Sequence, residues 1–154
     1  MKAYVDANVL ARYYLAYDDR KDAHALMEKV AKSRTAPLPV TTLLRLELAN
    51  ALQRLVHETR QGGQWRISPE GAAAAWAFFE EDLVDGVLFQ AVALSLEDIA
   101  ADVQAITERH TAREGFRTYD VIHIAAAKML RCDTFWSFDK KALKLAKLEG
   151  LKTN

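Results

Sequence analysis

The sequence predicts an α/β protein, a three-layer sandwich in which a mainly parallel sheet of four to five strands is flanked by helices. Short apolar runs of strand length alternate along the chain with longer segments of helical periodicity, as in strands joined by helical crossovers. The 154 residues include only 6 Gly and 3 Pro. That composition favours helices with short connections over a β-sandwich with many turns.

The expected strands are short apolar runs, at residues 3–5, 38–41, 87–92 and 134–138, with a short edge strand at 151–153. The expected helices repeat apolar side chains every three to four residues, at residues 9–17, 22–32, 43–60, 69–84, a segment after Ser95, 119–131 and 139–147. Helix-capping side chains are expected at Thr42, Ser68, Ser95 and Thr118. No repeat or linker interrupts the pattern, so residues 1–154 are predicted to form a single domain.

Composition excludes several classes of protein. The 21 basic and 21 acidic side chains cancel, so contact with nucleic acid would have to come from a local basic patch. Cys132 is the one cysteine, which excludes an internal disulfide and a multi-cysteine zinc site; a buried, inert thiol is expected. No signal-peptide core follows Met1 and no apolar run is long enough to span a bilayer, so we expect a soluble, cytoplasmic protein without a membrane partner.

Four acidic residues stand where the predicted fold would bring them together. Asp6 and Asp139 follow the first and fourth strands, Glu47 lies on the helix after the second strand, and Asp120 lies in the first turn of a buried helix. The carboxyl ends of parallel strands meet at one edge of a sheet, where functional groups gather. Carboxylates near a core repel one another unless a cation compensates them, and oxygen ligands suit Mg²⁺ or Mn²⁺.

Each acid also has a purely structural interpretation. Asp6 and Asp139 could cap the helices that follow them, and Asp120 could interact with a helix dipole. Glu47 could pair with Arg45 or Arg54. The hypothesis of a metal site rests on all four acids lying at one sheet edge.

The ordered set of motifs resembles the PIN-domain nucleases, and most of all the VapC-type toxins of toxin–antitoxin pairs. The motifs are Asp6-x-Asn8, Leu46-Glu47-Leu48, the run from Tyr119-Asp120 through His123 to Ala127, and Ser137-Phe138-Asp139. The resemblance covers essentially the whole chain. It implies a Mg²⁺- or Mn²⁺-dependent endoribonuclease, a homodimer, and inhibition by a cognate antitoxin. It also implies that Asp6, Glu47, Asp120 and Asp139 hold the metal and carry catalysis, supported by Asn8 and Ser137.

Basic residues near these acids are candidates for contacts to an RNA backbone. Arg117 lies three residues before Asp120, and Lys140 follows Asp139 on a lysine-rich helix whose charges could equally form ordinary surface ion pairs. His123 is expected to be a packed, hydrogen-bonded histidine. Two alternatives remain open: a catalytically inactive PIN fold that serves as a protein-binding scaffold, and a metal-dependent nuclease that acts on DNA.

Overall fold

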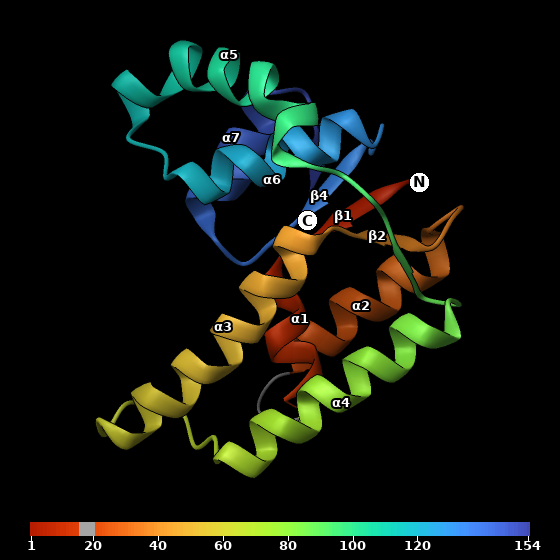
Figure 1. Ribbon diagram of the computed structural model, residues 1–154, viewed down its shortest axis with the longest axis vertical. Helices are drawn as coiled ribbons and strands as arrows, with labels where there is room; N and C mark the ends of the chain where they lie inside the picture. The colour runs from red at the N-terminus through yellow and green to blue at the C-terminus, as the bar shows by residue number, and fades with distance from the viewer. Residues whose placement is uncertain (16–20) are drawn as a thin grey trace.

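The computed structural model describes residues 1–15 and 21–154, and in these ranges short strands and helices alternate along the chain (Figure 1). The strands are β1 (Ala3–Val5), β2 (Leu38–Val40), β3 (Phe89–Ala91), β4 (Thr134–Trp136) and β5 (Lys152–Thr153). The helices are α1 (Ala7–Tyr14), α2 (Lys21–Ser33), α3 (Thr42–Arg60), α4 (Pro69–Asp85), α5 (Leu96–Glu114), α6 (Thr118–Met129) and α7 (Lys140–Leu148). Each predicted element is present; the expected end of the first helix, at residues 16 and 17, lies outside the described residues.

All strand pairs recorded in the described residues are parallel, as predicted. The strands form two hydrogen-bonded sets, β1-β4-β5 and β2-β3, with Val5 opposite Trp136 and Leu38 opposite Phe89. β1 and β2 lie next to each other, but the backbone hydrogen bond recorded between their segments is the one from Thr35 N to Met1 O, 2.9 Å, rather than a ladder. The predicted α/β sandwich is confirmed, with its sheet divided at this point.

The helices form two layers, one on each side of the strands (Figure 1). α6 packs on both α5 and α7, and α7 also packs on β4 and β5. On the other side, α1 contacts α2, α3 and α4, and α4 packs on β3. The carboxyl ends of β1 and β4 therefore open between the layers, where α3 faces α6 and α7.

Helix caps explain where several elements begin. Ser68 and Ser95 cap α4 and α5 as predicted, and Ser95 forms the expected capping box with Asp98. The prediction of Thr42 as the cap of α3 was wrong: the hydroxyl of Thr41 accepts from Leu44 N at 3.1 Å, and the helix already includes Thr42.

Thr118 is likewise the first residue of α6 and not its cap. Arg117 holds the cap position without a side-chain cap bond, because a guanidinium has no acceptor for the backbone N–H groups; its side chain forms ion pairs with nearby carboxylates.

The core is continuous from the strands into both helical layers. Its largest fully buried side chains include Tyr4, Phe79, Phe89, Phe135 and Ile124. The middle of α6 is buried as expected, whereas Tyr119 and Met129 at its two ends are exposed. Cys132 is buried as predicted, and burial raises the pKa of its thiol to about 11, which disfavours the reactive thiolate at neutral pH. No helix in the described part of the chain is long and apolar enough to cross a membrane.

Candidate metal centre

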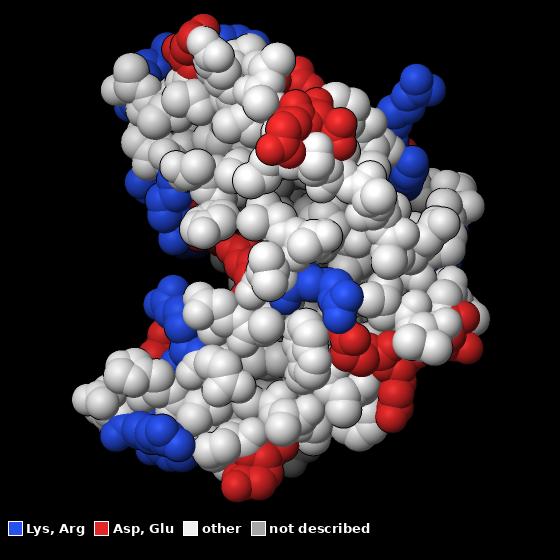
Figure 2. All heavy atoms as spheres, viewed as in Figure 1, with Lys and Arg blue, Asp and Glu red and all other residues white. Residues whose placement is uncertain are grey.

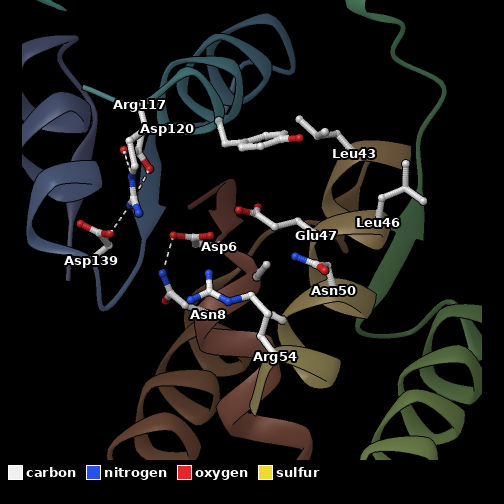
Figure 3. Close-up of a pocket in the computed structure, with 13 residues that line it drawn as sticks. Asp6, Asn8, Leu43, Leu46, Glu47, Asn50, Arg54, Arg117, Asp120 and Asp139 are labelled. Carbon is white, nitrogen blue, oxygen red and sulfur yellow. Dashed lines mark hydrogen bonds and ion pairs between the residues drawn. The ribbon is translucent and has the colours of Figure 1, made fainter. Parts of the chain in front are cut away.

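A cavity of about 460 Å³ opens between α3 and the α6–α7 side of the molecule (Figure 3). Its lining residues come from α1, α3, α6 and the β4–α7 junction. They are Asp6, Ala7, Asn8, Leu43, Leu46, Glu47, Asn50, Ala51, Arg54, Arg117, Tyr119, Asp120 and Asp139. All four acids predicted from the sequence therefore lie on one cavity, although 133 positions separate the first from the last.

Asp6 lies at the end of β1, and its side chain is held by two hydrogen bonds. Asn8 Nδ2 and the hydroxyl of Ser137 both donate to Asp6 Oδ2, each at 2.6 Å. Asp6 is only 7 % exposed, and burial raises its pKa, although nearby His123 and the Ser137 bond act in the opposite direction. Asp6 occupies the cap position of α1, as the structural interpretation expected, but its side chain makes no capping hydrogen bond.

Asn8 and Ser137 connect α1 to the β4–α7 junction. Asn8 Nδ2 donates to Ser137 Oγ at 2.9 Å, and Asn8 Oδ1 accepts from Phe138 N at 3.0 Å. Ser137 Oγ also accepts from Asp139 N at 2.9 Å. The two side chains thus join the Asp6 segment to the Asp139 segment by hydrogen bonds.

Glu47 projects from α3 toward Asp6 (Figure 3) and forms a short hydrogen bond with His123 Nε2. The ion pair of Glu47 with Arg45 or Arg54, which the sequence left open, does not form. Arg45 binds Glu80 at 2.8 Å, and Arg54 lies 3.5 Å from Glu58.

His123 is packed and hydrogen-bonded as expected, but it also contacts the site. It is 3 % exposed, and its Nδ1 lies 2.9 Å from the hydroxyl of Tyr4. Burial lowers the pKa of His123, but the bond to Glu47 and the negative charges of Glu47 and Asp6 outweigh burial and raise it above the ordinary value. The sequence signal for this contact was the spacing of three from Asp120, which puts both side chains on one helix face.

Asp120 and Asp139 share a single guanidinium. Arg117 Nε and Nη2 lie 3.1 and 3.2 Å from the Asp120 carboxylate, and Nη2 also lies 2.5 Å from Asp139 Oδ2. The hydrogen bonds to Asp120 and Asp139 and the negative charges of these two carboxylates raise the pKa of Arg117. Asp139 also caps α7, accepting from Lys141 N at 2.7 Å, so the capping interpretation of Asp139 was right and is compatible with its place on the cavity.

The predicted RNA-contacting residues are in different surroundings. Arg117 lines the cavity. Lys140 is exposed on the first turn of α7, and it does not line the cavity in the part of the chain that the structure describes. Of the other lysines on α7, Lys144 pairs with Glu114 and Lys141 reaches Gly115 O, which are the ordinary surface contacts considered from the sequence.

The donor set fits a divalent cation. Asp6, Glu47 and His123 each offer one ligand atom, and these atoms lie within 4.8 Å of one another. The His123 nitrogen of this group is hydrogen-bonded to Glu47 Oε2, so a ligand set of carboxylate oxygens, as expected from the sequence, stays a prediction.

A family model described as the PIN domain matches residues 3–148, so this chain belongs to the PIN-domain family. PIN domains are generally nucleases that use divalent metals, and the acidic cavity is consistent with that class. A toxin–antitoxin complex from Klebsiella pneumoniae contains a chain of similar fold, with a TM-score of 0.55 and 16 % sequence identity over 97 % of this chain and 95 % of that chain. No curated protein sequence matches this chain.

Proposed function

We propose that this protein is a metal-dependent endoribonuclease, the toxin of a toxin–antitoxin pair, with Asp6, Glu47, Asp120 and Asp139 as its catalytic and metal-binding residues. The observation that carries the proposal is the convergence of these four carboxylates, from four separate segments, on one cavity. So many acids around one space repel one another unless cations compensate them. Asp6 is a buried carboxylate that the protein maintains at the cost of burying its charge.

The residues divide into three roles. Asp6 and Glu47, with Asp120 and Asp139 opposite, would hold Mg²⁺ or Mn²⁺, which supplies an activated water and stabilises charge on the attacked phosphate. Asn8 and Ser137 hold the Asp6 carboxylate in a single orientation through their bonds to Oδ2. Arg117 places positive charge in the lining of the cavity, where it can contact a phosphate once Asp120 and Asp139 bind metal.

The walls of the cavity favour unpaired RNA as the substrate. Leu46 and Tyr119 are 64 % and 58 % exposed on the cavity rim, and Leu43 lies beside them in the lining. Exposed aromatic and apolar side chains on which bases can stack, with basic side chains nearby for the phosphates, are typical of sites for single-stranded nucleic acid. Figure 2 shows blue Lys and Arg side chains on both edges of a notch with acidic atoms inside it. Arg54 and Arg117 contribute from the lining, and Lys140 is proposed as a more distant phosphate contact.

The expected partners are a cognate antitoxin and a second copy of the chain. The similar fold of a chain in a toxin–antitoxin complex supports an antitoxin partner, and the family resemblance supports a homodimer. We propose that the protein acts in the cytoplasm. A DNA-directed nuclease and an inactive scaffold are the alternatives; retention of all four acids favours an enzyme over a scaffold.

Mapping of RNA 5′ ends tests this proposal. RNA is collected after brief induction of the wild type, of Asp6→Asn/Asp120→Asn, and of Asp102→Asn, a control at an exposed acid on α5. We expect discrete new ends with the wild type and the control and none with the double variant. Equal end maps for all three folded proteins would contradict the proposal. Purified protein with Mn²⁺ and matched RNA and DNA strands then distinguishes the substrates.

A further inference from the structure

We propose that His123 is a positioning residue that fixes the Glu47 carboxylate toward the metal site, and that Tyr4 sets the orientation of the His123 ring. The inference rests on the proposed metal-dependent function and extends it to two residues that do not line the cavity. Neither residue is one of the four acids. Both are buried, so their effect on the cavity has to pass through Glu47.

The three residues form one hydrogen-bonded chain across three elements. Tyr4 on β1 is fully buried, and its hydroxyl lies 2.9 Å from His123 Nδ1. On the opposite side of the ring, His123 Nε2 bonds to Glu47 Oε2 on α3. The Tyr4 hydroxyl also lies 3.4 Å from Thr41 Oγ1, which caps α3, the helix that carries Glu47.

This chain makes Nε2 the donor to Glu47 in both protonation states of the imidazole. In the neutral ring, the Tyr4 hydroxyl donates to Nδ1, which leaves the ring proton on Nε2. In the charged ring, Nδ1 donates to the Tyr4 oxygen, and the hydroxyl proton can turn to Thr41. The Glu47 carboxylate therefore receives a hydrogen bond from the same direction in either state.

Glu47 needs such a partner. Its side chain is 32 % exposed and has several rotatable bonds, so without restraint it would occupy many orientations in water. The nearest arginines on its helix, Arg45 and Arg54, are engaged by Glu80 and Glu58. With Oε2 bound to His123, the carboxylate points toward Asp6 (Figure 3), and the ligand atoms of the two acids lie within 4.8 Å of each other.

β1 therefore contributes to the site twice. Asp6, directly after the strand, supplies a carboxylate, and Tyr4, within the strand, orients a second carboxylate through His123. Partners that orient metal-binding side chains affect affinity strongly, and their removal typically costs 10- to 100-fold in metal binding.

Two substitutions of His123 distinguish the roles of its two ring nitrogens. The amide nitrogen of His123→Gln can reach the position of Nε2 and donate to Glu47. His123→Asn has its amide at the position of Nδ1, near Tyr4, and is too short to reach Glu47. Tyr4→Phe removes the hydroxyl that orients the ring. Tyr14→Phe is its matched control, because Tyr14 also donates a hydrogen bond from α1, 2.5 Å to Asp82, away from the cavity.

Binding of Mn²⁺ to the purified, metal-free proteins is measured by calorimetry and by electron paramagnetic resonance, with thermal unfolding recorded in parallel. We expect His123→Asn to weaken Mn²⁺ binding about 10- to 100-fold. The Mn²⁺ affinity of His123→Gln should stay within a few-fold of the wild type, and that of Tyr4→Phe should lie between those of His123→Gln and His123→Asn. Tyr14→Phe should lower thermal stability without changing Mn²⁺ affinity.

The outcomes distinguish this inference from the function on which it rests. A wild type that does not bind Mn²⁺ would contradict the proposed function itself. A wild type that binds, with His123→Asn binding equally well, would overturn the positioning role. If His123→Gln were as weak as His123→Asn, the imidazole nitrogen would be a direct ligand and positioning would again be overturned. If His123→Asn does not fold, the Mn²⁺ affinities of Tyr4→Phe and Tyr14→Phe are compared instead. Equal affinities in these two variants would overturn the positioning role.

Discussion

Arg117 Nη2 lies 2.5 Å from Asp139 Oδ2, and the same guanidinium also binds Asp120 (Figure 3). A cation built into the chain therefore neutralises two of the four acids that the proposed function assigns to metal. Metal binding by these two carboxylates has to compete with the guanidinium. Arg117 is thus an electrostatic partner of the free site as well as a candidate contact for RNA.

The first prediction concerns this competition. Substitution of Arg117 by Gln is expected to strengthen Mn²⁺ binding about 3- to 10-fold, because about 1 kcal/mol of charge-assisted hydrogen bonding no longer opposes the metal. Affinity for RNA should fall in the same variant, because a phosphate contact is lost. Calorimetry with Mn²⁺ and filter binding with labelled RNA measure the two effects.

Arg113→Gln is the matched control, because Arg113 is exposed on α5 and pairs with Glu114 outside the cavity lining. It should change neither affinity. Weaker Mn²⁺ binding by Arg117→Gln would show that the guanidinium helps to hold the carboxylates in place, contrary to competition.

The second prediction concerns the cost of keeping Asp6 buried. In metal-free protein, Asp6→Asn is expected to raise the free energy of unfolding by about 1 kcal/mol, because a buried charge is replaced by a neutral group of the same shape. The oxygen of Asn can still accept from Asn8 and Ser137, as Asp6 Oδ2 does. Urea unfolding with and without Mn²⁺ tests this, since the metal should stabilise only the wild type. If the Asn variant were less stable than the wild type in metal-free buffer, burial of the Asp6 charge would not be destabilising, and the prediction would be wrong.

The positions of the acids were predictable because they depend on local pattern and on one rule of topology. Asp6 and Asp139 follow parallel strands, and the ends of parallel strands meet, so their proximity follows once the strands are recognised. Glu47 was recognised because helical spacing places it beside the core-facing residues of α3.

What could not be predicted depends on contacts between distant segments. The sequence places His123 on the same face as Asp120, but whether Tyr4 and Glu47 meet its two nitrogens depends on how α6 packs against β1 and α3. Two adjacent threonines made the start of α3 ambiguous by one residue, and the hydrogen bond from Leu44 N resolves it in favour of Thr41.

The third prediction concerns Glu149, which follows α7 and joins α5 to α6 through ion pairs that no local pattern in the sequence announces. Its side chain is 4 % exposed and binds Arg109 at 2.8 Å, His110 at 2.8 Å, and Lys128. Burial alone would raise its pKa, but the hydrogen bonds from Lys128, Arg109 and His110 outweigh burial and lower the pKa to about 2. Glu149 therefore contributes to stability as a charged group.

Glu149→Gln is expected to cost up to about 3 kcal/mol in the free energy of unfolding at pH 7. Because the folded pKa is depressed, this contribution is complete above the unfolded value of 4.5 and is lost as the pH falls toward about 2. Urea unfolding between pH 7 and pH 3 should show the difference between wild type and variant shrinking. Glu108→Gln, at an exposed position on α5, is the control. A difference that stays constant with pH would exclude the charged form as the source of stability.

The fourth prediction concerns the rim of the cavity. Tyr119 precedes Asp120, lines the cavity and is exposed, so its ring can stack on an unpaired base beside the attacked phosphate. Tyr119→Ala is expected to weaken binding of single-stranded RNA about 5- to 30-fold, corresponding to about 1–2 kcal/mol of stacking. Tyr119→Phe keeps the ring and should bind RNA as the wild type does. Because the side chain is exposed, neither variant should change the melting temperature.

Phe78→Ala provides the comparison for a general loss of exposed aromatic surface, because Phe78 is exposed on α4 outside the cavity lining. Fluorescence anisotropy with a labelled oligonucleotide, in Ca²⁺ in place of Mn²⁺ to slow cleavage, measures affinity directly. Equal losses for Tyr119→Ala and Phe78→Ala would point to nonspecific adhesion. If only Tyr119→Ala lost RNA affinity, and Tyr119→Phe bound RNA as the wild type does, a base would stack on the aromatic ring. That contact would set the direction in which the RNA strand crosses the acidic residues.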